Sequence, residues 1–156
     1  MYNSIDIARY MVYKYKEKFD RPLDELKLHK LLYLLYREYI IQYDGKLFEE
    51  NFYGWKFGPV LKSVRTEYMD NKFLNNCDTE LDENIKNLIN DILDKYGKKS
   101  SWSLSRLTHG EISWKNSRIG IEEGKNGDNP IKYEDIVIDA KNIKERREKL
   151  SELKNK

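Results

Sequence analysis

The sequence predicts a mainly α protein: a single compact helical domain around a central apolar helix, with a small β-strand or hairpin element. Three observations favour this class. Apolar residues recur at helical spacing in several segments, one segment is apolar around most of its circumference, and one aromatic segment between two glycines has extended character. The 156 residues, of which 39% are hydrophobic, suffice for one core.

The first helix is predicted between residues 4 and 19. Asn3 or Ser4 can cap it, because a short side-chain oxygen accepts a hydrogen bond from a free N–H of the first turn. Asp20 and Pro22 follow the last periodic residue and end the helix. Its apolar face comprises Ala8, Met11, Val12, Tyr15 and Phe19.

The strongest helix signal runs from about Glu25 to Tyr43, with Asp24 as its cap. A helix that is apolar over most of its circumference lies at the centre of a fold. We expect His29, Lys30 and Arg37 to face outward or toward a groove. The broad apolar stripe comprises Leu28, Leu31, Leu32, Leu35, Tyr39 and Tyr43, widened by Leu34, Tyr36 and Ile40.

The segment from Tyr53 to Val60 combines three aromatic rings with two glycines and a proline. Partial alternation predicts one short strand or an extended piece near residues 50–57. Pro59 suits the first turn of a third helix, where its missing N–H costs nothing. The rings either complete the core against the central helix or form a partly exposed platform for a partner.

Four further helices are predicted after a loop at residues 70–78. One is capped by Asp78 or Thr79 and ended by Gly97, and two short ones span about 102–108 and 114–119. Residues 120–130 form a loop or a hairpin tip, with a short extended piece at Ile131. The last helix runs from Tyr133 to about 150, and the charged end at 141–156 is a helical extension or a frayed tail.

The composition excludes several function classes. Cys77 is the sole cysteine, so no internal disulfide forms, and we expect a reducing, cytoplasmic environment. No run approaches the roughly 18 apolar residues of a membrane span. The two histidines, His29 and His109, are too far apart in the sequence for a short-spaced metal motif, and we expect no metal and no cofactor.

The arrangement of the polar residues in the sequence also disfavours catalysis. Ser105 and His109 stand at helical spacing and could form a nucleophile with its base. The simpler interpretation is that Thr108 and His109 fix a helix-ending turn at Gly110. The neighbouring acids Glu49 and Glu50 are expected to be solvated surface charges. We therefore expect a protein that is not an enzyme.

Three groups of residues carry a resemblance to a known family. The first is Lys27, Leu28, Lys30, Leu31, Leu32 and Tyr33; the second is Gly45, Leu47 and Phe48 with Trp55, Gly58, Pro59 and Val60; the third is Leu104, Leu107, Thr108, His109 and Trp114. In this order and spacing they resemble the SocA-like Panacea antitoxin domain, also described as a phage-associated GepA-type domain. The likeness covers about residues 5–138, and we assign 1–140 to this domain and 141–156 to the tail.

The resemblance implies an antitoxin of a two-gene toxin–antitoxin system that neutralises its toxin by direct protein–protein contact. One branch of the family delivers its toxin to an ATP-dependent protease, so such a protease is a second implied partner. The alternative is a nucleic-acid-binding regulator of its own operon, which the basic residues of the tail suggest. The net charge of +2 argues against nucleic acid as a partner. A homo-oligomer stays open, and no membrane partner is expected.

We expect the aromatic segment and the turn at residues 108–109 to meet near the N-terminal end of the central helix, forming a groove for the toxin. The predicted partner-binding residues are Tyr33, Tyr53, Trp55, Lys56, Phe57 and His109. The predicted structural residues are Lys30, Leu31, Leu32, Gly58, Pro59, Val60, Thr108 and Trp114.

Overall fold

The computed structural model describes residues 1–71 and 80–155, and within them the chain forms seven helices and two short strands. The predicted mainly α class with a small β element is confirmed. In chain order the elements are α1 (Ser4–Phe19), α2 (Glu25–Tyr43), β1 (Tyr53–Trp55), β2 (Gly58–Val60), α3 (Lys62–Met69), α4 (Glu83–Tyr96), α5 (Ser101–His109), α6 (Ile112–Ser117) and α7 (Tyr133–Lys154).

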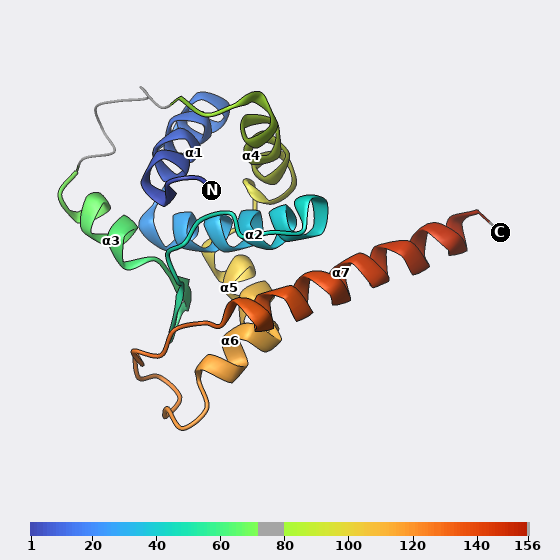
Figure 1. Cartoon of the computed structure of the whole chain (residues 1–156). Helices are drawn as coiled ribbons and strands as arrows, with labels where there is room; N and C mark the ends of the chain where they lie inside the picture. The colour runs from blue at the N-terminus through green and yellow to red at the C-terminus, as the bar shows by residue number, and fades with distance from the viewer. Residues whose placement is uncertain (72–79, 156) are drawn as a thin grey trace.

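Helix α2 is the centre of the molecule. Figure 1 shows it running between α1 and α4 on one side and α5, α6 and α7 on the other. Every residue from Lys27 to Arg37 is buried, including the polar side chains of Lys27, His29, Lys30 and Arg37. His29, Lys30 and Arg37 therefore do not face outward, because other elements cover that side as well. Arg37 instead lines a groove, the other alternative that the sequence left open.

The first two helices begin where the sequence predicts. The Asn3 side chain accepts hydrogen bonds from two N–H groups of α1, and the Asp24 side chain accepts one from Lys27 of α2. Asp20 and Asp44 end these helices in the left-handed conformation with φ of 53°. Short polar side chains tolerate this conformation better than most residues do.

The aromatic segment forms a two-stranded antiparallel hairpin, in which Trp55 pairs with Gly58 and Gly54 with Pro59. Pro59 is a strand residue and does not start α3, so that prediction is wrong. Its missing N–H is tolerated because Gly54 and Pro59 form a pair in which both N–H positions point away from the partner strand. The Gly54 N–H accordingly bonds on the outer side of β1, to the Asn129 carbonyl at 3.1 Å. The piece around Pro130 bridges to Tyr53 on that outer side of β1, and residues 119–132 form no hairpin of their own.

Helix α3 begins at Lys62, and its N-terminus is capped from outside the helix. The Glu50 carboxylate accepts hydrogen bonds from the Ser63 N–H at 3.2 Å, from the Ser63 hydroxyl and from the Ser4 hydroxyl. The prediction that Glu50 is only a solvated charge is therefore wrong. A carboxylate at this position satisfies a free N–H of the first turn and interacts favourably with the helix dipole.

The later helices follow the predicted periodicity with shifted ends. Asp82 caps α4, while the predicted caps Asp78 and Thr79 lie outside the described residues. The predicted short helices at 102–108 and 114–119 correspond to α5 and α6. Leu104 is buried as expected, but Leu107 is 43% exposed and does not pack inward.

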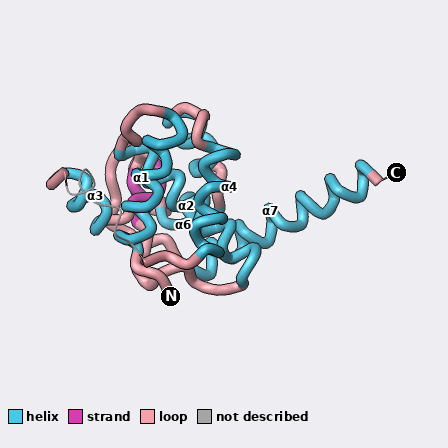
Figure 2. Tube along the Cα trace, turned by 90° about the horizontal axis from the view of Figure 1, so that it is seen from above, coloured by secondary structure: helices cyan, strands magenta, loops and turns pink. Residues whose placement is uncertain are grey.

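The charged C-terminal segment continues α7 without a break to Lys154. Figures 1 and 2, seen from directions 90° apart, both show its second half projecting away from the rest of the molecule. Only Ile136, Asp139 and Ala140 of this helix are buried. None of the described helices combines the length and hydropathy that a bilayer crossing requires.

Candidate functional site

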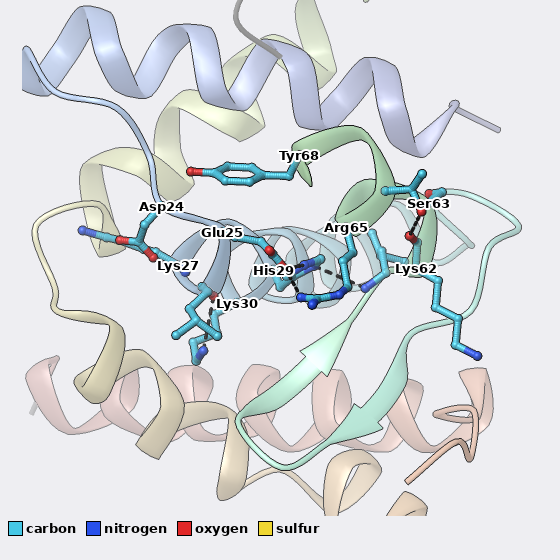
Figure 3. Close-up of polar contacts among 12 residues, drawn as sticks. Asp24, Glu25, Lys27, His29, Lys30, Lys62, Ser63, Arg65 and Tyr68 are labelled. Atoms are coloured by element: carbon cyan, nitrogen blue, oxygen red, sulfur yellow. Dashed lines mark hydrogen bonds and ion pairs between the residues drawn. The ribbon is translucent and has the colours of Figure 1, made fainter. Parts of the chain in front are cut away.

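A polar network joins the first turns of α2 to the hairpin and to α3 (Figure 3). The His29 Nδ1 accepts a hydrogen bond from the Leu61 N–H at 3.3 Å, at the end of β2. Its Nε2 lies 3.2 Å from a Glu25 carboxylate oxygen, which also pairs with Arg65 at 2.8 Å. Since Nδ1 accepts, the proton of a neutral ring sits on Nε2 and is donated to Glu25.

The network favours a neutral His29. Burial lowers the pKa of this imidazole below its usual range, and the hydrogen bond to Glu25 opposes that shift only in part. The same hydrogen bond lowers the pKa of Glu25. His29 therefore fixes the backbone where the hairpin leaves toward α3, which is a structural role.

Lys30 lies buried where α2, the hairpin and α5 meet. Its ammonium donates to the Leu26 carbonyl at 3.2 Å, and burial lowers its pKa to about 8. Gly58 lies against it with φ of 125°, and a Cβ there would come within 3.1 Å of the Thr108 hydroxyl. The positive φ and this close approach both favour glycine at position 58.

The hairpin and the end of α5 come together beside the N-terminal half of α2. The Ser105 hydroxyl donates to the Phe57 carbonyl at 3.3 Å, and the Trp114 indole N–H donates to the Trp55 carbonyl at 2.9 Å. The His109 ring stacks on Trp114 at a centroid distance of 4.0 Å. The Ser105 hydroxyl is thus directed to the Phe57 carbonyl, and the His109 Nε2 accepts no hydrogen bond from it.

The imidazole of His109 is largely neutral in this setting. Burial lowers its pKa, the nearby Lys30 ammonium lowers it further, and the Phe57 carbonyl opposes both effects. Among the described residues the His109 Nε2 has no hydrogen-bond partner. Its stacked ring supports the turn and leaves only part of the side chain accessible to a partner.

The hairpin tip is the accessible part of the aromatic segment. Phe57 is 54% exposed, and the Lys56 ammonium lies 5.0 Å from the centre of its ring. Trp55 is half-buried, with the Arg65 guanidinium 5.3 Å from its ring. Tyr53, at the other end of the strand, is half-buried under the Lys62 ammonium, 3.9 Å from the ring centre.

Trp102 belongs to the same surface and was missed from the sequence. It is 67% exposed and lies one turn before Ser105, which contacts the hairpin tip, and the Arg106 guanidinium is 5.0 Å from its ring. The available signal was that Trp102 does not share the buried face of Leu104 and Thr108. We call Trp55, Lys56, Phe57 and Trp102 the tip surface.

Tyr33 has a different environment from the tip surface. Its ring is fully buried, and its hydroxyl contacts the Ser113 hydroxyl at 2.6 Å and the Asp139 carboxylate at 3.1 Å. The other Asp139 contacts, at 2.9 Å, are the N–H groups of Ile112 and Ser113. Asp139 thus caps α6, which has no cap of its own, and Tyr33 has no surface to offer a partner.

Arg37 forms a buried ion pair with Glu111 at the α5–α6 turn. Burial raises the pKa of the Glu111 carboxyl to about 7, against the opposing effect of the Arg37 guanidinium. Arg37 also reaches the Tyr96 hydroxyl at 3.4 Å, while its Nε has no partner among the described residues. Within the described ranges, no three His, Cys, Asp or Glu side chains gather as metal ligands would.

The geometry defines a small helical domain in which the hairpin and the turn at His109 pack against α2, while the tip of the hairpin exposes Phe57. Residues 28–115 match the family model described as antitoxin SocA-like, Panacea domain. Since this match covers more than half of the chain, the protein belongs to that family. Neither the curated proteins nor the solved structures contain a significant match to this chain.

Proposed function

We propose that the protein is an antitoxin that neutralises its toxin by direct binding, without a catalytic step, and that the tip surface is a principal contact. Membership of the antitoxin SocA-like family carries the antitoxin role. We choose the tip surface as the contact because it presents large aromatic side chains to solvent within the residues that match the family.

The chemistry of the tip surface suits a protein partner. Trp and Phe bury a large area with few rotatable bonds, so they dominate the energetics of many interfaces. Lys56 adds one positive charge beside Phe57, which favours an acidic group opposite. The backbone beneath is held by the bonds to Ser105 and Trp114, so binding orders little additional chain.

The remaining predicted contacts are ranked by their accessibility. Tyr53 and His109 are half-buried at the margins, and we propose that they support the tip rather than bind strongly. Tyr33 is omitted from the contact surface because it is fully buried. Delivery of the toxin to an ATP-dependent protease is compatible with direct binding as a later step.

The test is co-expression with the toxin encoded beside the gene. The wild-type chain is expected to restore growth and to co-purify with the toxin. Phe57→Ser and Trp102→Ser are expected to weaken the complex at least tenfold, since exposed aromatic anchors cost about 2 kcal/mol or more when truncated. Binding is measured by calorimetry, and folding by the thermal midpoint.

Met69→Ser is the matched control, because Met69 is 63% exposed on α3 and outside the tip surface. It should bind the toxin as the wild type does. A soluble wild-type chain that neither restores growth nor binds the toxin would refute the proposed function. A full complex with both serine variants would refute the tip surface alone.

A further inference from the structure

A groove of about 640 Å³ lies between α7 and the α5–α6 turn. Its floor contains the buried pair of Arg37 and Glu111, and one wall is the helix that projects from the body in Figure 1. We call it the α7 groove. Much of this wall lies beyond residue 115, where the family match ends.

The groove carries an excess of positive charge. Its cationic side chains are Arg37, Lys95, Arg106, Arg146 and Arg147. Its acidic side chains, Glu111 and Asp139, already have partners, Glu111 in Arg37 and Asp139 in the N-terminus of α6. Within the described residues Lys95, Arg106 and Arg146 form no ion pair. The Lys95 ammonium lies 5.3 Å from the Tyr96 ring and the Arg106 guanidinium 5.0 Å from the Trp102 ring, but neither contact neutralises the charge.

Apolar side chains alternate with these charges. Leu107, Ile112 and Leu150 line the groove and are 43%, 38% and 54% exposed. Their exposure has a cost in water, and a partner that covers them recovers about 25 cal/mol per Å² of apolar surface. The combination therefore fits an amphipathic segment with acidic residues on its flanks and apolar residues along its centre.

Other occupants fit less well. A second copy of this chain would bring another positive groove against the first, because residues 141–154 hold six basic and three acidic side chains. Nucleic acid would leave the apolar side chains poorly covered and would meet Glu145, Glu148 and Glu152, which are exposed along α7.

We propose that the α7 groove binds an acidic, amphipathic segment of the protein partner. This identification of the partner as the toxin rests on the proposed function, whereas the chemistry of the groove does not. The groove and the tip surface are then two adjacent contacts, which meet where the Arg106 guanidinium lies on the Trp102 ring. Two linked contacts raise the overall affinity above that of either one.

The first experiment uses a synthetic probe, a fluorescein-labelled peptide of glutamates with a leucine at every third or fourth position. Fluorescence anisotropy is expected to show binding that weakens as salt rises, because exposed charges are screened over about 8–10 Å at physiological ionic strength. A peptide with lysines in place of the glutamates, and one with serines in place of the leucines, should bind at least tenfold more weakly.

The double variant Lys95→Glu with Arg146→Glu is expected to lose at least tenfold in affinity for the acidic peptide, and neither residue contacts Trp102 of the tip surface in the way that Arg106 does. Its matched control is Lys16→Glu with Lys115→Glu, which changes the net charge equally at two exposed positions that do not line the groove. A second variant, Leu107→Ser with Leu150→Ser, should also lose affinity while the charge stays constant. Thermal midpoints establish that each variant is folded.

The outcomes separate the two proposals. If the acidic peptide does not bind, or binds the charge-reversed groove as well as the control, the groove proposal is overturned. Duplex DNA that displaces the peptide at equal concentration would overturn it too. If the wild type binds the toxin and the charge-reversed groove binds it equally well, only the groove fails; if the peptide binds but no toxin complex forms, only the proposed function fails.

Discussion

At the scale of the residue, Glu111 has the environment that most affects how stability depends on pH. It is buried beside Asp139 and beneath the α7 groove, so its charge is stabilised mainly by Arg37. Burial disfavours the ionised carboxylate more than Arg37 favours it, so the pKa of Glu111 is raised in spite of the ion pair. The position was not identified from the sequence, since a lone Glu after a Gly carries no pattern.

Glu111 predicts a pH dependence of stability. Its pKa is about 7 in the folded protein against 4.5 ordinarily, so the folded state retains a proton that the unfolded chain has lost. The stability from this group is therefore fully present below the ordinary pKa and is lost as pH rises through about 7. In urea unfolding, the stability of the wild type relative to Glu111→Gln should fall by on the order of 1–3 kcal/mol between about pH 5 and about pH 8.

His29 and His109 act in the opposite direction, since their lowered pKa values make stability fall as pH drops below the ordinary histidine pKa. Both residues are present in the wild type and in Glu111→Gln, so the difference between the two profiles isolates Glu111. Identical profiles would contradict the assignment.

At the scale of the element, the hairpin packs closely against α6 because Gly54 has no side chain. A Cβ at Gly54 would lie 1.9 Å from the Ser117 hydroxyl and 2.8 Å from its Cβ. Gly54→Ala should therefore destabilise the fold by about 1–3 kcal/mol through overpacking. Ser117→Gly combined with it should recover part of the loss, as a double-mutant cycle in urea would measure.

Gly45→Ala is the control for this prediction. A Cβ there meets only the Tyr43 carbonyl, at 3.9 Å, and Gly45 is not among the positive-φ glycines. Its free energy of unfolding should stay within about 0.5 kcal/mol of the wild type. A Gly54→Ala variant as stable as Gly45→Ala would show that α6 moves away freely.

The helices could be predicted from the sequence because their apolar periodicity and caps are local signals, as Asn3 and Asp24 show. The burial of the polar side chains of α2 could not be predicted from the sequence. Whether His29 and Arg37 face solvent depends on the Leu61 N–H and on Glu111, which lie 32 and 74 residues away. Pro59 was misplaced for the same reason, since the sequence does not show that it pairs with Gly54 across a hairpin, where its missing N–H has no partner to lose.

At the scale of the whole molecule, the two halves of α7 differ in what they contribute to stability. Its first turns supply Asp139 to the core, while its second half is exposed beyond the body, as Figure 2 shows. A chain ending after residue 132 should lose cooperative thermal unfolding, because α6 loses its cap and Tyr33 its partner. A chain ending after residue 148 keeps Asp139 and Arg147 and should keep most of the thermal midpoint.

The contacts of Tyr33 and Arg37 also impose an order on synthesis. Helix α2 leaves the ribosome early, but the partners of these two side chains stand at positions 111, 113 and 139. Until α7 has emerged, the centre of the molecule contains polar groups that have lost water without gaining a protein partner. A nascent chain is therefore not expected to complete its core until translation is nearly finished, so the central helix is made long before its polar side chains find their partners.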